Sequence, residues 1–412
     1  MEKDNKIFQG TNSTPLTTRD VDIPLGPDVF KLNAAKVKDI DIIEGDHMFL
    51  NMGPQHPSTH GVLRLELLTD GEVCVKIIPH IGYLHRCFEK IAESVPYNQV
   101  IPYTDRLDYL ASMNNNLGFA LAVEKLMGIE VNDRVKVIRV IMSELNRIAS
   151  HLVAFGTYAL DLGAFTPFLY AFRERERIID LFEDVCGARL LYNYIWIGGL
   201  SHDLPPGWVE KCRDFCDYFL PNIKEYNDLL SYNQIFIDRT ADIGVMNAEQ
   251  AIAYGATGPN LRGAGVKWDL RKTEPYSGYE KYDFDICIGS GEKGTVGDCW
   301  DRYMVRIREM EQSTRIIRQA LENLPEGDVK EAIPKNFRKI PEGEVYMRTE
   351  APRGELGFYV ISDGTQIPYR VKCRANTFTS LSAVPEIAEG AMIADIVAII
   401  GSIDIVLGEV DR

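Results

Sequence analysis

Motifs that would hold a metal or a disulfide framework are missing from this sequence. Among its eight cysteines there is no Cys-x-x-Cys pair, and no His-Glu-x-x-His segment accompanies its seven histidines. Cys212 and Cys216 stand four residues apart in a stretch of helical character, where we expect two thiols packed in a helix. Scattered cysteines in a long acidic chain indicate a reducing compartment with few or no disulfides. A zinc site is not expected.

Long apolar runs are missing too. A helix that crosses a bilayer needs about 20 consecutive apolar residues. The most apolar stretch, 391–407, is broken by Asp395, Gly401 and Asp404, so we expect a buried helix followed by a strand there. Residues 1–12 are polar and show no signal-peptide pattern. The chain is therefore not expected to cross a membrane by itself.

A surplus of basic residues is absent as well. The chain has 60 Asp and Glu against 45 Lys and Arg, which gives a net charge of −15. Because phosphate backbones are bound by basic surfaces, nucleic acid is not expected as a partner. The glycine-rich tract 255–265 has no Walker lysine in register, and it does not open a helix after a strand. Nucleotide binding is therefore not expected either.

What the sequence contains divides into successive segments. Residues 1–45 suggest an extended lead segment, and residues 46–100 an antiparallel β section. Residues 101–325 suggest a bundle of long helices with inserted glycine-rich loops. Residues 344–412 suggest strands and a helix, and 325–343 a variable surface loop. The expected fold class is α+β.

Periodicity and turn residues place the individual elements. Strands are expected at 47–52, 62–68, 73–79, 344–350, 357–361 and 369–374. Helices are expected at 104–128, 132–162, 170–191, 207–230, 298–324 and 385–399. The Asp70-Gly71 pair predicts a hairpin between the second and third strands.

The densest group of reactive side chains lies near the beginning of the chain. Four of the seven histidines are found there, and they are His56, His60, His80 and His85. The first two belong to the loop 53–61, whose prolines and glycines restrict its backbone. Imidazole titrates near neutral pH, so it suits proton delivery or metal ligation. Four unrelated histidines that only hydrogen-bond their loops remain an alternative.

Two further polar residues, Tyr109 and Asp161, stand in apolar helical surroundings. A buried carboxylate needs a partner, most often a histidine or an arginine. Asp161 could also cap its helix or form a local salt bridge.

Short strings along the chain resemble one known family. They lie at 56–64, 82–86, 105–109, 160–164, 254–259, 268–272, 297–303, 350–355 and 408–412. Each string alone is weak, but together and in this order, from about residue 40 to residue 412, they are specific. They resemble the D subunit, the quinone-site subunit, of respiratory complex I, the proton-pumping NADH:quinone oxidoreductase.

The resemblance implies a fold and a set of site residues. The fold would be similar to that of the large subunit of nickel–iron hydrogenases. His60 and Tyr109 would hydrogen-bond the two ends of a quinone head group, and Asp161 would pair with His60. His56 and Thr59 would also contribute to the quinone site. Arg86 would lie near an iron–sulfur cluster that a partner subunit holds.

The resemblance also implies the setting of the chain. The chain itself would hold no cofactor, and quinone would be its substrate. Its partners would be the iron–sulfur B subunit, the C and I subunits and the membrane-embedded H subunit. The chain would be a peripheral membrane protein on the cytoplasmic side of a bacterial inner membrane.

The sequence departs from the family pattern after Arg86. Cys87-Phe88-Glu89-Lys90 stands where the family usually has Gly-Thr-Glu-Lys. No second cysteine lies close to Cys87, and 402–407 contains none, so a nickel–iron centre has no chemical support. A non-catalytic scaffold subunit of a related membrane-bound hydrogenase or dehydrogenase complex is the alternative function. The combination of His60, Tyr109 and Asp161 favours the quinone-site subunit.

Overall fold

The computed structural model describes residues 47–56, 59–330 and 340–412. The compact unit described below is Phe49–Arg412. The expected lead segment 1–45 lies outside the described residues, as does most of the expected surface loop 325–343.

The strands form three small antiparallel groups in the order β1-β2-β3, β4-β5 and β6-β7-β8. They are β1 (His47–Met52), β2 (Arg64–Asp70), β3 (Val73–His80), β4 (Ile195–Trp196), β5 (Gly199–Leu200), β6 (Gly343–Ala351), β7 (Gly354–Ser362) and β8 (Arg370–Arg374).

Among the described helices, six are longer than ten residues. In the sequence, five of them lie between β3 and β6, and one follows β8. The five are α4 (Ser112–Met127), α5 (Asp133–Asp161), α6 (Phe165–Cys186), α7 (Trp208–Tyr226) and α12 (Cys299–Glu322), and the last is α15 (Ile393–Ile403). The shorter ones are α2 (Phe88–Ala92), α3 (Tyr97–Thr104), α8 (Gln234–Asp238), α9 (Ala248–Ala253), α10 (Gly258–Gly263), α11 (Leu270–Thr273), α13 (Asn376–Leu381), α14 (Val384–Ile387) and α16 (Leu407–Asp411).

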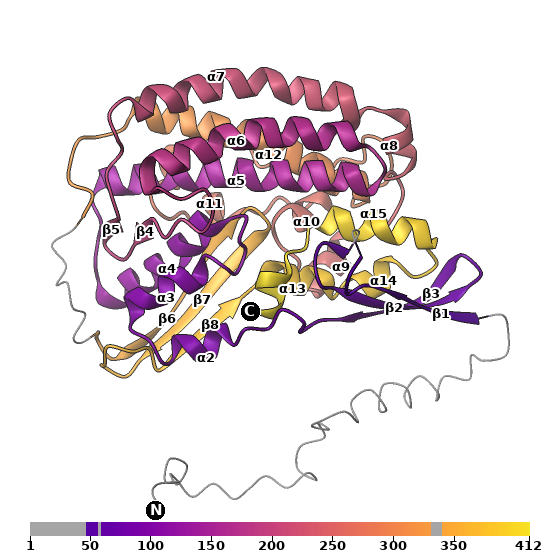
Figure 1. The fold of residues 1–412 in the computed structure, drawn as a ribbon, viewed down its shortest axis with the longest axis horizontal. Coiled ribbons are helices and arrows are strands. Elements are labelled where there is room, and N and C mark those ends of the chain that lie inside the picture. Colours follow the sequence, from indigo (N-terminus) through magenta and orange to yellow (C-terminus); the bar gives the residue numbers. More distant parts are fainter. Residues whose placement is uncertain (1–46, 57–58, 331–339) are drawn as a thin grey trace, which may run out of the picture. The chain divides into compact units, whose positions relative to one another are not determined.

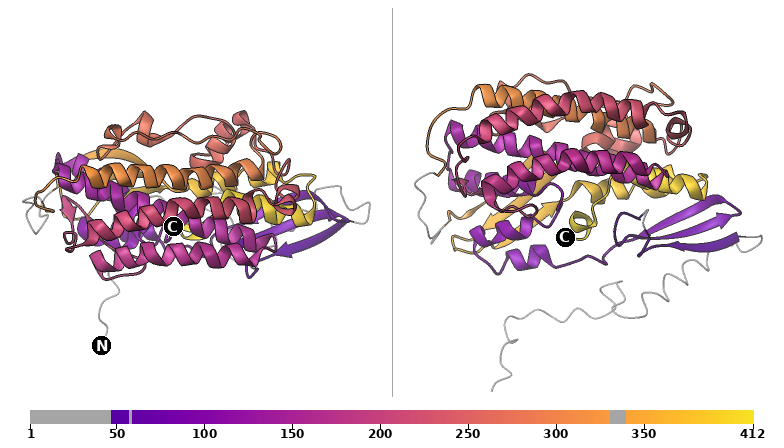
Figure 2. Two further views of the ribbon diagram at one scale, coloured as in Figure 1. Left: turned by 90° about the horizontal axis from the view of Figure 1, so that it is seen from above. Right: turned by 45° about the horizontal axis from the view of Figure 1, so that its top comes forward.

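Helices α5, α6, α7 and α12 lie side by side as a bundle (Figures 1 and 2). Helix α5 begins at Asn132, whose side chain accepts a hydrogen bond from the backbone N–H of Val135. Asp298 caps α12 in the same way. Most residues of α5 are buried, because α4, α6, α12 and α15 all pack against it.

The last sheet shares the core of the bundle. Strands β6 and β7 pack on α4, where the Phe119 and Phe358 rings meet edge to face at 5.6 Å. Gly118 of α4 has no side chain and so leaves room for the ring of Phe358. We call this continuous apolar cluster of the helix bundle and the β6–β8 sheet the first core.

The sheet β1-β2-β3 builds a separate cluster. Its buried residues, among them Leu63 and Leu65, pack with α14, α15 and parts of α9 and α10. We call this cluster the second core. Helices α14 and α15, which follow β8 in the sequence, therefore belong to the second core. They cover the sheet β1-β2-β3, which comes much earlier in the chain (Figure 1).

The α+β class is confirmed, with a hairpin in which Asp70 pairs with Val73. The strand expected at the end of 391–407 is wrong. Helix α15 ends where Asp404 takes a left-handed conformation (φ 59°), and α16 follows. Ile405 and Leu407 fill the second core from this turn instead of pairing in a sheet. Helices α2 and α3 also begin before residue 101, inside the segment interpreted as β.

All eight cysteines are free thiols. Of the helices within the described residues, none has both the length and the hydropathy needed to cross a bilayer.

Gly258 is expected to be essential for the fold. A β-carbon there would lie 2.3 Å from the Cα of Gly354, and the residue has φ +63°. Gly258→Ala should cost about 1–2 kcal/mol for the left-handed backbone and about 1–3 kcal/mol more for the overlap. The measurement is the thermal stability of the assembled protein. Gly255→Ala is the control, since its φ is +67° but no atom lies within 4 Å. Equal losses in the two variants would contradict the prediction.

Candidate functional site

The loop between β1 and β2 is held by a close backbone approach and by a threonine side chain. Gly53 (φ +86°) passes so close to Leu63 that a β-carbon would lie 2.0 Å from its carbonyl oxygen. The fully buried Thr59 donates its hydroxyl proton to the carbonyl oxygens of His56 (2.7 Å) and Gly61 (3.2 Å). The hydroxyl of Thr59 is thus occupied within the loop, which favours a structural role over ligand binding. His56 is exposed and pairs with Gly61 in an isolated β-bridge.

His60 leaves this loop toward the end of α5. Its Nε2 lies 2.5 Å from Oδ2 of Asp161, in a close hydrogen bond between the imidazole and the carboxylate. The two side chains are 12% and 8% exposed, so they are mostly removed from water and yet accessible. His60 adopts a left-handed backbone (φ 50°), which non-glycine residues rarely do. The expected pairing of His60 with Asp161 is therefore present.

The other two histidines of the group make local contacts. His80 Nε2 lies 3.0 Å from Glu66 Oε2 on the neighbouring strand. His85 Nδ1 donates to the carbonyl oxygen of Asp411 at 2.6 Å. His80 and His85 therefore fit the alternative in which a histidine only makes a local hydrogen bond.

Tyr109 lies between α3 and α4 and is half-buried. Burial raises the pKa of its phenol above the ordinary value of 10, and the opposing cations Arg353 and Arg86 lower it less. The phenol therefore keeps its proton at neutral pH and can donate a hydrogen bond.

One short segment connects the two parts of the site. A β-carbon at Gly61, next to His60, would lie 3.7 Å from the Leu407 side chain. A β-carbon at Gly408 would lie 3.3 Å from the Tyr109 ring. Since residues 407 and 408 are consecutive, with Cα atoms about 3.8 Å apart, Gly61 and Tyr109 face neighbouring residues at the start of α16.

Arg86 is exposed, and its charge is close enough to Tyr109 to oppose the rise in pKa that burial causes in the phenol. Its guanidinium donates to the carbonyl oxygen of Arg106 at 2.5 Å, and its backbone N–H donates to that of Arg412 at 3.1 Å. The Asp411 carboxylate accepts from the N–H groups of Gly82 (2.8 Å) and Leu84 (2.6 Å). The segment that carries Arg86 is thus fixed by α16.

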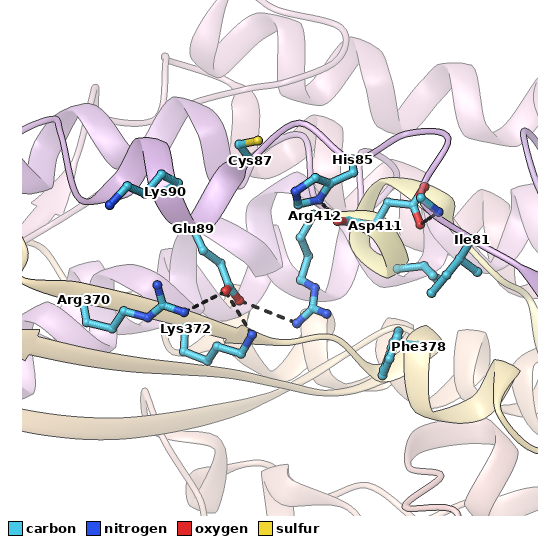
Figure 3. A pocket seen from close by; sticks show the side chains of 12 residues that line it. Ile81, His85, Cys87, Glu89, Lys90, Arg370, Lys372, Phe378, Asp411 and Arg412 are labelled. Carbon is cyan, nitrogen blue, oxygen red and sulfur yellow. Dashed lines mark hydrogen bonds and ion pairs between the residues drawn. The ribbon is translucent and has the colours of Figure 1, made fainter. Parts of the chain in front are cut away.

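A cavity of about 420 Å³ opens next to this segment (Figure 3). Cys87 lines it, together with the cationic residues Lys90, Arg370, Lys372 and Arg412. Figure 3 shows Glu89 facing three of these cations, with Lys372 Nζ at 3.0 Å. A second hollow of about 350 Å³ begins at Leu162, directly after Asp161, and has mostly apolar walls from α6 and α8. Neither cavity is lined by His60 or Tyr109.

A buried arginine ties the residues around Tyr109 together. Arg353, in the turn between β6 and β7, donates to Asp108 (2.7 Å), Asp404 (2.9 Å) and the Ser150 hydroxyl (2.9 Å). Burial lowers the pKa of Arg353, but the two carboxylates outweigh this effect and raise it above its ordinary value. Asp108 precedes Tyr109, and Asp404 lies a few residues before Gly408, so one guanidinium positions both neighbours of the site.

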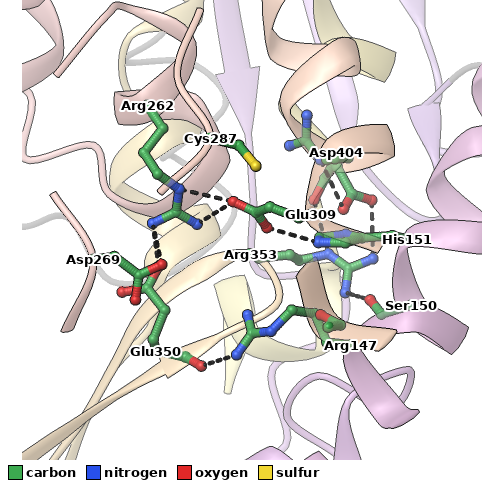
Figure 4. A network of polar contacts seen from close by, with 12 residues as sticks. Arg147, Ser150, His151, Arg262, Asp269, Cys287, Glu309, Glu350, Arg353 and Asp404 are labelled. Carbon is green, nitrogen blue, oxygen red and sulfur yellow. Dashed lines mark hydrogen bonds and ion pairs between the residues drawn. The ribbon is translucent and has the colours of Figure 1, made fainter. Parts of the chain in front are cut away.

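Further buried charges extend from this arginine into the bundle (Figure 4). His151 of α5 contacts Glu309 of α12 at 2.9 Å, and Glu309 also pairs with Arg262 at 2.7 Å. Arg262 in turn pairs with Glu350 at 2.7 Å. Burial lowers the pKa of His151, which favours its neutral form. Charges this deep require partners, and the helices are held together partly by meeting that requirement.

Asp105 is a buried carboxyl group near the same site. It accepts hydrogen bonds from the Asn116 side chain (2.8 Å) and from the Asn193 backbone (3.1 Å). Burial raises the pKa of Asp105 to about 7.

The residues that sequence reasoning missed are Arg353, Asp404, Leu407 and Gly408. Arg353 and Gly408 belong to strings that resemble the family, but nothing in the spacing of those strings indicated contacts with the residues around Tyr109. Within the described part of the chain, no group of three or more His, Cys, Asp or Glu side chains could hold a metal ion.

Comparison with known proteins gives a consistent result. The family model of the 49 kDa subunit of the respiratory-chain NADH dehydrogenase matches residues 161–338 and 332–412. The D subunit of the NADH-quinone oxidoreductase of Chlorobaculum tepidum is 57% identical over 379 residues, which cover 91% of this chain and 94% of the relative. Its counterpart in Chlorobium chlorochromatii, which has the same name, is 57% identical over 89% of this chain and 92% of its own. The first of the numbered D subunits of Cytophaga hutchinsonii is 54% identical over 91% and 98%.

The raised pKa of Asp105 predicts a pH dependence of stability. The unfolded carboxyl releases its proton near pH 3.8 and the folded one near 7, so the folded state loses stability as pH rises between these values. Asp105→Asn removes this loss, which amounts to at most roughly 4 kcal/mol at about 1.4 kcal/mol per pH unit. It also loses one acceptor oxygen, at a constant cost of about 1–3 kcal/mol.

The stability difference between Asp105→Asn and the unsubstituted protein should therefore move in favour of the variant from pH 5 to pH 8. Thermal unfolding at several pH values measures it. A difference that does not change with pH would contradict the assignment.

Proposed function

The chain belongs to the family of the 49 kDa subunit of the respiratory-chain NADH dehydrogenase, and we propose that it binds and protonates quinone through His60, Asp161 and Tyr109. It is a subunit of NADH:quinone oxidoreductase and works with other subunits of that enzyme. The alternative, a scaffold subunit of a hydrogenase-related complex, is not supported, because the relatives named above are all D subunits of NADH-quinone oxidoreductase by name.

The observation that carries the proposal is the contact between His60 and Asp161. A carboxylate at 2.5 Å from Nε2 fixes the orientation of the imidazole ring. The two side chains are mostly buried but remain partly exposed to solvent. An imidazolium in this position can donate a hydrogen bond, and then a proton, to a carbonyl oxygen of the substrate.

Tyr109 is proposed to serve the other carbonyl of the quinone. Its phenol keeps its proton at neutral pH because burial raises its pKa. Tyr109 faces Gly408, and Gly61, next to His60, faces the adjacent Leu407. The proposed place of the quinone head group is therefore beside this turn, with one donor for each carbonyl.

Two such donors supply the number of protons that quinone reduction needs. A quinone takes up two electrons and two protons to become a quinol, and each carbonyl oxygen gains one proton. We propose that His60 and Tyr109 each pass on one proton and are reprotonated afterwards. The electrons would come from an iron–sulfur cluster of the B subunit. No group of this chain is required to hold a cofactor.

The partners and the location are proposed from the same assignment. Arg86 and the cationic cavity beside Cys87 would face the iron–sulfur B subunit, which the positive charges and the exposed position of Arg86 support. The C, I and membrane-embedded H subunits would complete the surroundings. The chain would then lie on the cytoplasmic side of the inner membrane, where the quinone is reached from the bilayer.

Tyr109→Phe should reduce quinone reductase activity about 100-fold, since general acid catalysis contributes about 10²–10⁴-fold. The measurement is NADH:quinone activity of the membrane-bound enzyme. Transfer from NADH to a soluble acceptor upstream of quinone should survive. Tyr369→Phe is the matched control, because that tyrosine is 66% exposed on the surface. Unchanged quinone activity in Tyr109→Phe would show that the site is assigned wrongly.

Asp161→Asn should leave the enzyme assembled and slow quinone reduction by about tenfold or more, because the amide no longer holds the imidazole ring as the carboxylate does. The quantities to compare are the amount of assembled complex and the turnover with quinone. Asp214→Asn, on the exposed face of α7, is the control. Loss of the whole complex in Asp161→Asn alone would point to a structural role.

A further inference from the structure

Gly401 of α15 lies directly against the end of α5. A β-carbon on Gly401 would stand 2.5 Å from Cδ2 and 2.9 Å from Cε2 of Tyr158. It would also stand 3.4 Å from Oδ2 of Asp161, the oxygen that contacts His60. The helix α15 can therefore approach Asp161 this closely only because residue 401 has no side chain.

The Tyr158 ring has little room to move, because the hollow that it borders together with Gly401 has a volume of only about 10 Å³. It is 2% exposed, and its other neighbours are the rings of Phe236 at 5.7 Å and Tyr303 at 6.1 Å. Protein interiors are close-packed, so a displaced ring displaces its helix. Tyr158 and Asp161 are three residues apart on α5 and so lie on the same face of the helix.

The end of α5 is the part that can give way. Upstream, Phe155 is clamped between Tyr226 (4.7 Å) and Tyr303 (6.2 Å). Downstream, α5 ends at Asp161, and the exposed Gly163 follows in a turn. Pressure from α15 would therefore move the last turn of α5, which carries the Asp161 carboxylate.

We propose that Gly401 is a positioning residue for quinone reduction: its missing side chain lets Tyr158 and Asp161 seat against α15 and so sets the carboxylate at hydrogen-bonding distance from His60. This inference rests on the proposed function of the His60–Asp161 pair. Gly401 itself touches neither the imidazole nor the substrate.

The test is Gly401→Ala in the complete membrane-bound enzyme. Alanine favours a helix over glycine by about 1 kcal/mol, so any loss comes from the new contact and not from helix propensity. We expect kcat with quinone to fall by about 10- to 100-fold, the range in which a misplaced catalytic group costs activity. The KM should change little, and transfer from NADH to a soluble acceptor should persist.

Gly156→Ala is the matched control. It is also a glycine inside a packed helix, and a β-carbon there would lie 3.1 Å from the Cα of Phe168 on α6. The substitution crowds α5 from the side of α6, away from the carboxylate. We expect it to lower thermal stability while kcat and the pH profile of quinone reduction stay unchanged.

Two further readouts separate positioning from general damage. The pH profile of Gly401→Ala should change in the same direction as that of Asp161→Asn. The double variant Gly401→Ala with Tyr158→Leu should recover activity, because the smaller side chain returns the space that the methyl group takes.

The outcomes distinguish the two proposals. If Asp161→Asn loses activity but Gly401→Ala keeps it, the positioning inference is overturned and the proposed function stands. If Asp161→Asn keeps full activity, the proposed function itself fails. If Gly401→Ala does not assemble, Tyr158→Leu alone decides: without the methyl group that fills the freed space in the double variant, the last turn of α5 with Asp161 should shift toward Gly401 and kcat should fall several-fold. Unchanged activity overturns the inference.

Discussion

Buried arginines join the two cores of the structure: Arg302 and Arg306 of α12 bind Ser402 of α15, and Arg353 binds the end of the same helix nearest the site. Arg353 leaves the turn of the sheet that belongs to the first core, and it holds Asp404 at the end of α15, which belongs to the second. The same guanidinium holds Asp108 at 2.7 Å. Removing one partner of such a buried pair costs about 3–5 kcal/mol, since the remaining charge is left without compensation. The arginine thus fixes the distance between the segments that carry the site.

The proposed chemistry lies along this same boundary. His60 comes from a loop on the sheet of the second core, whereas Asp161 ends a helix of the first. Tyr109 lies between α3 and α4, two helices of the first core, and the Gly408 that it contacts belongs to α16, whose Leu407 packs into the second. Glycines allow the approaches: at 258, 401 and 408 a β-carbon would overlap the neighbouring segment. Close packing between distant segments, and not any single motif, therefore builds the site.

The sequence predicted the local features well. Asp70-Gly71 predicted its hairpin, and the apolar period of α5 predicted a long helix that ends near Asp161. The contacts between distant segments could not be predicted in this way. Asp404 at the end of α15 is bound by Arg353, and these residues are 51 positions apart. The partner of Asp161 is 101 positions away, and the residues alone left that partner open. Only the resemblance to a family indicated His60.

The His60–Asp161 pair is one of several contacts between the two cores. It joins the loop that precedes β2 to the last residue of α5. Arg302 and Arg306 of α12 also bind Ser402 in the last turn of α15. Because α15 packs against α5 as well, the position of the Asp161 carboxylate is set by the packing around it together with the hydrogen bond. The distance between His60 and Asp161 therefore depends on how closely these distant segments approach one another.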